Sequence, residues 1–167
     1  MSITFECTDG KINVNHAIIT LSKTIEDMIS DCGDENMEII IPYPISDVKF
    51  VSDFVDYYKS NEIGGGQPKD APKDESRDGD LAYKYVYTAC SGKSCEDVMK
   101  LIECVSYLNI KCLFDDGLCK YIALNFIKGK TTEEMRKSFN QPDDLPQFEK
   151  DKVNGTIDEI KNAVNAK

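Results

Sequence analysis

Alternating hydrophobic and polar positions open the chain. Residues 3–6 and 11–14 each alternate between apolar and polar side chains, which is typical of strands with one buried face. The Asp-Gly pair at 9–10 separates these segments, and Asp-Gly between two alternating runs is a strong hairpin signal. A third strand is expected at 37–41, where an apolar run ends at Pro42, because proline cannot donate a ladder hydrogen bond.

Helices are expected between and after these strands. Thr24 is the predicted N-cap of a short helix that ends just before Gly33. Ser46 is the predicted N-cap of a second helix, whose apolar positions recur at i, i+3, i+4 and i+7. Ser94 begins another helix, with Asp97 at the capping-box position. Together these elements predict an α+β fold in which a small sheet is covered by helices.

Residues 60–80 interrupt this pattern with four glycines, two prolines and nine charged side chains. Such a segment cannot bury enough apolar surface to offset its ordering entropy, so a disordered loop inside the domain is expected. The three glycines at 64–66 do not indicate a phosphate loop, because no strand leads in and no Gly-Lys-Ser/Thr follows. The tyrosine-rich residues 81–90 fit a short strand and a helical turn equally well.

The strongest apolar helical pattern lies at 94–139. Its first helix ends near Asn109, a second occupies about 113–128 and is closed by Gly129, and a third opens at Thr131 with an acid three residues later. The second helix carries more large apolar side chains than one-sided burial requires. This excess predicts a surface that another protein covers.

The tail after this region is polar. Pro142 and Pro146 argue against one long helix, so a short helix anchored by Phe148 and Val153 is expected, followed by a last one that opens at Thr156. A short amphipathic helix at a chain end is marginal alone in water. We therefore expect the last helix to pack on the body or on a partner.

The charge balance argues against a nucleic-acid partner. Thirty acidic residues outnumber 20 basic ones, which gives a net charge of −10, whereas phosphate contacts need clustered Lys and Arg. No apolar run approaches the length of about 20 residues that crosses a bilayer, and the N-terminus lacks the basic region and apolar run of a signal peptide. No membrane partner is therefore expected.

Candidate chemistry is sparse. Seven cysteines are scattered without a C-x-x-C spacing and His16 is the only histidine, so neither a metal site nor a cofactor is expected. Reduced, partly buried thiols are typical of the cytosol and nucleus, so a cytoplasmic and nuclear location is expected. His16 has no nucleophile-and-carboxylate set, and paired acids at 115–116 and 133–134 are more simply a turn and a first helical turn. We therefore expect no enzymatic activity.

Two tracts in the apolar region resemble one known family. Residues 107–111 read Tyr-Leu-Asn-Ile-Lys, and residues 127–140 read IKGKTTEEMRKSFN. They resemble the segments YLDIK or YLNIK and IKGKTPEEIRKTFN of the Skp adaptors (S-phase-kinase-associated proteins) of SCF ubiquitin ligases. Weaker matches follow in the same order along the chain, at 8–10, 24–28 and 41–45.

This resemblance covers about residues 3–145. It implies a BTB/POZ domain at 1–110, with the disordered loop at about 60–80, followed by an F-box-binding helical extension at 111–167. It also implies a non-catalytic adaptor of an SCF (cullin-RING) ubiquitin ligase, which bridges the N-terminal region of a cullin and F-box substrate receptors. A structural or assembly protein on the same fold, without ligase activity, is the alternative.

Two further interpretations stay open at this point. An Elongin-C-like adaptor is the weaker one, because that relative stops before the helices that begin near Leu113. A weak homodimer of the free protein is also expected, because exposed apolar patches favour association.

The resemblance assigns roles by position. Ser106, Tyr107 and Asn109 would face the cullin, and the family usually has asparagine where Ser106 stands. The F-box groove, or the core beneath it, would be formed by Leu113, Leu118, Ile122, Phe126, Ile127, Met135 and Phe139. Each of these residues has a second interpretation as a plain core residue.

Three departures from the family pattern bear on these roles. The family's W-D-x-E-F segment is replaced at 80–83, and the chain has no tryptophan. Thr132 stands where the family has proline, which excludes prolyl hydroxylation there. The stretch 115–128 is two residues longer than the family pattern, which would rotate a helical face by about 200° unless loops absorb the difference.

Overall fold

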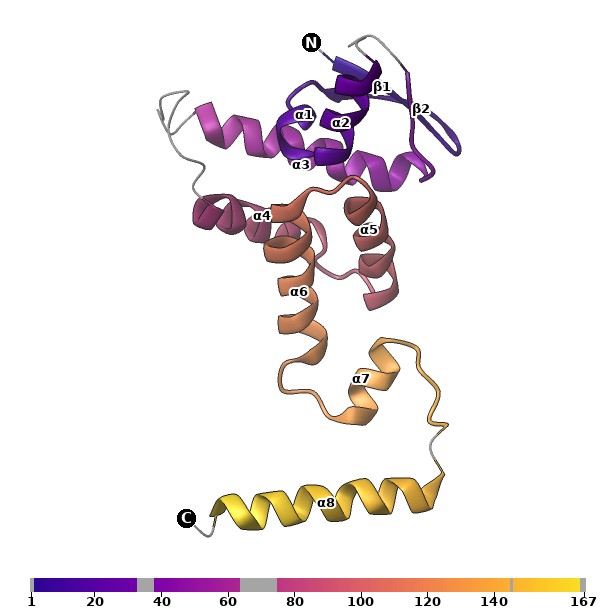
Figure 1. The fold of residues 1–167 in the computed structure, drawn as a ribbon, viewed down its shortest axis with the longest axis vertical. Coiled ribbons are helices and arrows are strands. Elements are labelled where there is room, and N and C mark those ends of the chain that lie inside the picture. Colours follow the sequence, from indigo (N-terminus) through magenta and orange to yellow (C-terminus); the bar gives the residue numbers. More distant parts are fainter. Residues whose placement is uncertain (1, 33–37, 64–74, 145, 166–167) are drawn as a thin grey trace.

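A three-stranded sheet lies at one end of the molecule, and helices pack against it and lead away from it (Figure 1). The structure is a computed structural model that describes residues 2–32, 38–63, 75–144 and 146–165. Its strands are β1 (Ser2–Cys7), β2 (Gly10–Asn15) and β3 (Ile39–Ile40), in the order β2-β1-β3. This arrangement confirms the expected N-terminal hairpin and the α+β class.

The register of the hairpin follows from the alternating pattern. β1 and β2 are antiparallel, with Ile3 opposite Val14 and Phe5 opposite Ile12. Ile3, Phe5 and Val14 are buried, so one face of the hairpin enters the core as the period of two requires.

The third strand is shorter than expected. Of the predicted segment 37–41, residue 37 lies outside the described residues, and β3 covers only two residues, parallel to β1. The backbone N–H of Ile41 continues the pairing by donating to the Glu6 carbonyl oxygen at 2.8 Å, after which Pro42 ends it.

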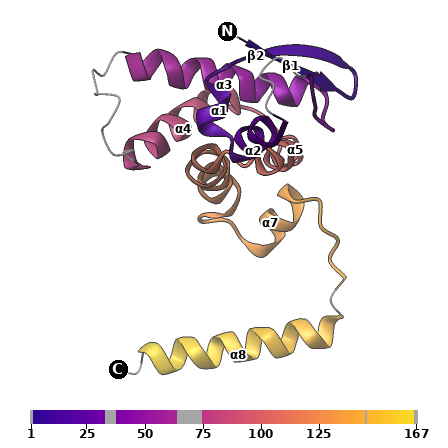
Figure 2. The same ribbon diagram turned by 45° about the horizontal axis from the view of Figure 1, so that its top comes forward.

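Two helices follow the hairpin, then β3, and then the remaining helices. The helices are α1 (Ile18–Leu21), α2 (Lys23–Cys32), α3 (Ile45–Ile63), α4 (Glu75–Ala89), α5 (Cys95–Tyr107), η1 (Leu113–Cys119), α6 (Lys120–Ile122), η2 (Ala123–Ile127), α7 (Thr132–Ser138) and α8 (Gln147–Asn165). The stretches η1 and η2 are π-helical. With α6 between them they form one continuous helix, which is seen end-on in Figure 2.

The predicted cap of α2 is wrong by two residues. Thr24 lies inside the helix, and its hydroxyl donates to the Tyr107 carbonyl oxygen at 2.9 Å. Ser22 occupies the cap position instead, where its Oγ accepts from the Ile25 N–H at 3.2 Å. The same hydroxyl donates to the Leu108 carbonyl oxygen, 86 residues away. Gly33, the expected end signal, lies outside the described residues.

The start of α3 also differs from the prediction, because the helix begins at Ile45 and Ser46 lies within it. The first free N–H of α3, that of Ile45, donates to Oδ1 of Asp9 at 2.7 Å. A residue of the hairpin turn thus serves as the acceptor that a helix start needs. The adjacent Gly10 has φ of +147°, and a Cβ there would lie 2.9 Å from Cδ1 of Ile45, so glycine is required at this crossing.

The expected loop at 60–80 is wrong at both ends. α3 continues to Ile63 and α4 begins at Glu75, while residues 64–74 lie outside the described part of the chain. Residues 81–89, which fitted either a strand or a helix, belong to α4. The deciding signal is the buried set Ala82, Val86 and Cys90 at helical spacing, rather than the alternating tyrosines.

The tail forms one helix, so the prediction of two short helices is wrong. α8 runs without a break through Thr156, whose hydroxyl donates to the Lys152 carbonyl oxygen at 3.1 Å. Pro146 precedes the helix, and its carbonyl oxygen accepts from the N–H groups of Glu149 and Lys150. A proline at this position interrupts no hydrogen bond of the helix. In Figures 1 and 2, α8 lies apart from the rest of the molecule. Across the described residues, no helix is long and apolar enough to cross a membrane.

One buried core joins the sheet to the helices. It includes Phe5 of β1, Phe54 of α3 and Leu108 after α5, and it continues through Leu113 and Leu118 of η1. η1 packs against both α4 and α5. The core therefore extends across the boundary expected at 110–111.

Gly117 lies in the tight contact between η1 and α4. A Cβ at Gly117 would lie 3.1 Å from Cγ2 of Val86 and 3.3 Å from Cδ1 of Leu113. Gly117→Val should therefore lower the free energy of unfolding by about 1–3 kcal/mol, the usual cost of overpacking. Gly155→Ala is the control, because nothing lies within 4 Å of that site in α8. It should raise the helix content seen by circular dichroism, and equal stability losses in both variants would contradict the proposed packing.

Ser22 offers a second stability test, because one buried hydroxyl joins α2 to the end of α5. Ser22→Ala removes the cap and leaves the Leu108 carbonyl without this donor, so we expect a loss of about 2–3 kcal/mol. Urea denaturation with an unchanged m value measures it. Ser94→Ala, at an exposed cap on Asp97, should cost only about 1 kcal/mol. Equal losses would show that the bond to Leu108 adds nothing.

Candidate protein-docking surfaces

The helix that carries most predicted F-box contacts contains two wide turns. The Lys120 N–H donates to the Asp115 carbonyl oxygen, and the Lys128 N–H donates to that of Ala123 at 2.8 Å. Each bond spans five residues, whereas a regular α-helix spans four. A π turn holds about one residue more than an α turn. Two such turns give a physical means of accommodating the two additional residues expected at 115–128 without rotating the rest of the helix.

The predicted F-box residues divide into buried and accessible groups. Leu113, Leu118 and Ile122 are buried in the chain's own core. Phe126, Met135 and Phe139 are half-buried, and Ile127 is 44% exposed. The accessible group lies on η2 and around α7, which contact each other. The buried group lies earlier on the same helix, where η1 packs against α4 and α5, which agrees with its interpretation as core. Direct contact of those three residues with a partner stays a prediction.

Leu124 is an accessible apolar residue absent from the predicted set. It is 41% exposed on η2, between Tyr121 and Ile127. In the sequence, Leu124 lies off the main apolar stripe of this helix, and an apolar residue off that stripe indicates exposure. Together Leu124, Phe126, Ile127, Met135 and Phe139 form what we call the η2–α7 surface.

Tyr121 connects this surface to the core. Its hydroxyl donates to the buried Cys90 carbonyl oxygen at 2.9 Å, and its ring lies 6.2 Å from that of Phe126 and 6.4 Å from that of Tyr87. Burial raises the pKa of the Tyr121 phenol above its usual value, so the hydroxyl stays a donor at neutral pH. The position of Phe126 is thus linked to α4.

α7 begins as the sequence predicts. The Thr131 N–H donates to Oε2 of Glu134 at 2.8 Å, and the Glu134 N–H donates to Oγ1 of Thr131 at 3.3 Å, which completes a capping box. These bonds lower the pKa of the Glu134 carboxyl. Gly129, with φ of +74°, reverses the chain between η2 and α7. The connection between η2 and α7 is therefore fixed by nearby residues, with the glycine at its start and the capping box at its end.

Ion pairs follow α7 and lead into α8. Asp143 accepts from Arg136 of α7 and from Nζ of Lys150 of α8, the latter at 2.6 Å. Lys150 and Arg136 lower the pKa of the Asp143 carboxyl. One carboxylate thus contacts both helices, although α8 exposes Phe148, Val153 and Ile157 to solvent.

The predicted cullin-facing residues lie together at the end of α5. Ser106 and Asn109 are exposed, and Tyr107 is half-buried with its ring 5.6 Å from that of Tyr43. Asn109 has φ of +50°, a conformation that asparagine tolerates better than most residues. The Lys23 N–H reaches the Asn109 carbonyl oxygen at 3.5 Å. The turn is therefore held against the start of α2.

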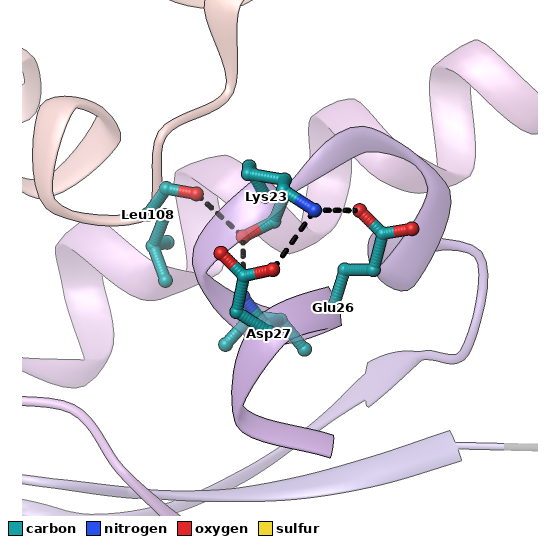
Figure 3. Close-up of polar contacts among 6 residues, drawn as sticks. Lys23, Glu26, Asp27 and Leu108 are labelled. Carbon is teal, nitrogen blue, oxygen red and sulfur yellow. Dashed lines mark hydrogen bonds and ion pairs between the residues drawn. The ribbon is translucent and has the colours of Figure 1, made fainter. Parts of the chain in front are cut away.

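Acidic side chains flank this turn. Figure 3 shows Lys23 between Glu26 and Asp27, at 3.0 and 2.8 Å, with the Leu108 carbonyl beside the start of α2. Hydrogen bonds to Asp27 and Glu26 raise the pKa of the Lys23 ammonium. Because all three groups are exposed, these pairs shape the local charge more than they stabilise the fold.

The described residues hold no cluster of three His, Cys, Asp or Glu side chains with metal-binding geometry. Burial raises the pKa of Cys90 to about 11 and that of Cys104 to about 12. A protonated thiol is a poor nucleophile, so neither cysteine has the environment of a reactive one. The η2–α7 surface offers exposed apolar area to another protein, and the end of α5 offers polar side chains beside acidic groups.

Comparison with known proteins places the chain in a family. Residues 1–60 match the family model "Skp1 family, tetramerisation domain", and residues 116–155 match "Skp1 family, dimerisation domain". The "SCF ubiquitin ligase complex protein SKP1a" of Dictyostelium discoideum is 32% identical over 152 residues, which cover 90% of each chain. The chain belongs to the Skp1 family.

Other relatives have similar coverage. The "E3 ubiquitin ligase complex SCF subunit sconC" of Talaromyces marneffei is 29% identical over 153 residues, covering 90% of this chain and 91% of that protein. The "Suppressor of kinetochore protein 1" of Schizosaccharomyces pombe is 30% identical over 142 residues, covering 84% of each. The matches run through both candidate surfaces, and they confirm the family resemblance found in the sequence and its BTB/POZ fold.

Proposed function

We propose that the protein is a non-catalytic adaptor of an SCF ubiquitin ligase, which binds an F-box substrate receptor through the η2–α7 surface and a cullin through the end of α5. The observation that carries this proposal is the accessible apolar surface of η2 and α7 in a Skp1-family chain. Relatives at about 30% identity over most of their length are named as SCF subunits. The adaptor works in the cytoplasm and nucleus, where these ligases would meet their substrates.

The two binding events can be measured separately. Purified chain is titrated with F-box domains and, independently, with the N-terminal region of a cullin. Binding of both supports the adaptor. Retained F-box binding without any cullin binding would favour the alternative, a structural or assembly protein on the same fold. The name of the Schizosaccharomyces pombe relative, which refers to the kinetochore, is the observation that keeps this alternative in view. No binding to any F-box domain would contradict both.

The exposed Ser106 makes the cullin contact adjustable. Ser106→Asn introduces the amide that is usual in the family, which offers a longer reach with both a donor and an acceptor. One added hydrogen bond should tighten cullin binding by about 3- to 10-fold, as measured by calorimetry. Ser91→Asn, an exposed serine before α5, is the control and should change nothing. Unchanged binding of the Ser106 variant, as in the control, would show that this side chain does not face the cullin.

The η2–α7 surface also explains why the free protein would self-associate. Exposed apolar area that a receptor covers in the complex is open to a second copy in its absence. An F-box domain would then dissociate the homodimer, which sedimentation at increasing receptor concentration can follow. A homodimer that persists with bound receptor would place the self-contact elsewhere.

A further inference from the structure

The wide turn η2 lies where the continuous helix passes from buried to exposed residues. Before it, Tyr121 and Ile122 are buried, and within it Leu124 and Ile127 are exposed. The Lys128 N–H bonds back to Ala123, five residues earlier. π turns are rare and often occur at functional sites. The wide turn at this boundary is therefore a candidate functional feature of the helix.

The contacts of Tyr121 depend on the width of this turn. In a regular α-helix, residues three or four apart are neighbours, whereas residues five apart point about 140° away from each other. The rings of Tyr121 and Phe126, five residues apart, are nevertheless in edge contact at 6.2 Å. The wide turn brings them together. Because Tyr121 is fixed by its bond to Cys90, the turn also sets the directions of Leu124 and Ile127.

Asn125 is an exposed polar residue of η2 whose side chain bonds back to the preceding turn. Its side-chain Nδ2 donates to the Tyr121 carbonyl oxygen at 2.8 Å, in addition to the backbone bonds of the helix. This side-chain bond joins residue 125, inside η2, to residue 121, just before the helix widens. Tyr121 is therefore held by its hydroxyl, its ring and its carbonyl oxygen together.

We propose that η2 determines which F-box receptors this chain accepts, with Asn125 as the positioning residue of the wide turn. The inference rests on the proposed adaptor function and adds the source of its selectivity. The preferred receptor carries an F-box helix whose apolar residues fit Leu124 and Ile127 as the wide turn presents them. A receptor fitted to a regular helix at this point meets Leu124 in another direction.

The wide turns can be closed one at a time. Deleting Asn125 removes one residue from η2, so that the turn can close to a regular α turn while its flanks keep their places. Deleting the exposed Asp116 does the same to η1 and is the matched control, because η1 packs against α4 and α5 inside the molecule. Thermal melting and far-UV circular dichroism report the fold of both deletions. Affinities are measured against a panel of F-box domains that bind the native chain.

We expect both deletions to fold. Deletion of Asn125 should weaken the receptors that the native chain prefers by about tenfold or more and change the order of affinities across the panel, whereas deletion of Asp116 should preserve that order within about threefold. A uniform loss without reordering, or an unchanged order in both, would overturn the inference. Unfolding of both deletions would also overturn it, because a turn with one residue in excess should tolerate its removal.

A point substitution keeps the length of the chain. Asn125→Ala removes only the bond to the Tyr121 carbonyl oxygen, and it should reorder the same panel with smaller changes of about three- to fivefold. Native chain that binds F-box domains, combined with unchanged selectivity in all variants, would refute the role of η2 and leave the adaptor function standing. Native chain that binds no F-box domain would refute the adaptor function, and this inference with it.

Discussion

Replacing Ile127 with aspartate should weaken F-box binding by about 100-fold and leave the fold intact. Ile127 is accessible on η2, beside the half-buried Phe126. A receptor that covers this site would bury the new carboxylate without a partner, and a loss of about 3 kcal/mol corresponds to about 100-fold in affinity. In the free protein the carboxylate stays in water, so the free energy of unfolding should change by less than about 0.5 kcal/mol. Calorimetric titration and urea denaturation measure the two quantities.

Ile40→Asp is the matched control for this prediction. Ile40 is 70% exposed in β3, which pairs with β1. The sheet lies at one end of the molecule, away from α7 (Figure 1). The same substitution there should leave F-box affinity within about twofold, because no receptor is expected on the sheet. If both variants bind normally, the receptor does not cover η2. If both lose binding, the effect comes from added negative charge rather than from the η2–α7 surface.

Elements with local causes were predictable from the sequence. The hairpin followed from an alternating pattern around Asp-Gly, and α5 and α7 followed from the capping residues Ser94 and Thr131. Each of these signals lies within a few residues of the element that it defines. The family tract at 127–140 was equally local, and it was sufficient to identify the family that the comparisons confirm.

The wrong predictions involve partners distant in sequence. Ser22 and Thr24 are both good cap residues, and the choice between them depends on Leu108 and Tyr107, more than 80 residues away. The start of α3 depends on Asp9 in the hairpin turn. No local propensity contains these contacts, so a local pattern misplaces the caps by one or two residues.

The candidate surface shows the same limit. The seven predicted F-box residues share one apolar pattern, yet α4 buries the first part of their helix and leaves η2 accessible. Wide turns also make predictions from α-helical periodicity fail, because Tyr121 and Phe126 are in contact at a spacing of five residues, which an α-helix does not allow. Measuring stability and binding together therefore separates the residues that contact a receptor from those that only form the core.

Leu118→Ala is the substitution in this set with the largest expected effect on stability. Leu118 is fully buried in η1, within the core that joins α4, α5 and the sheet. Removing a buried leucine side chain leaves a cavity and usually costs about 2–5 kcal/mol. For a chain of this size, each kcal/mol lowers the melting temperature by about 2–4 °C, so we expect a fall on the order of 10 °C. Calorimetry measures the melting temperature directly.

Leu124→Ala is the matched partner on the same helix, because the chemistry of the substitution is identical and only the environment differs. Leu124 is accessible, so its loss should cost about 0.5 kcal/mol or less in the free protein and yet weaken receptor binding by about tenfold or more. The folded fraction of the Leu118 variant should bind receptors nearly as tightly as the native chain. The opposite result, with binding lost at Leu118 and kept at Leu124, would mean that this helix rearranges when a receptor docks and exposes its present core face.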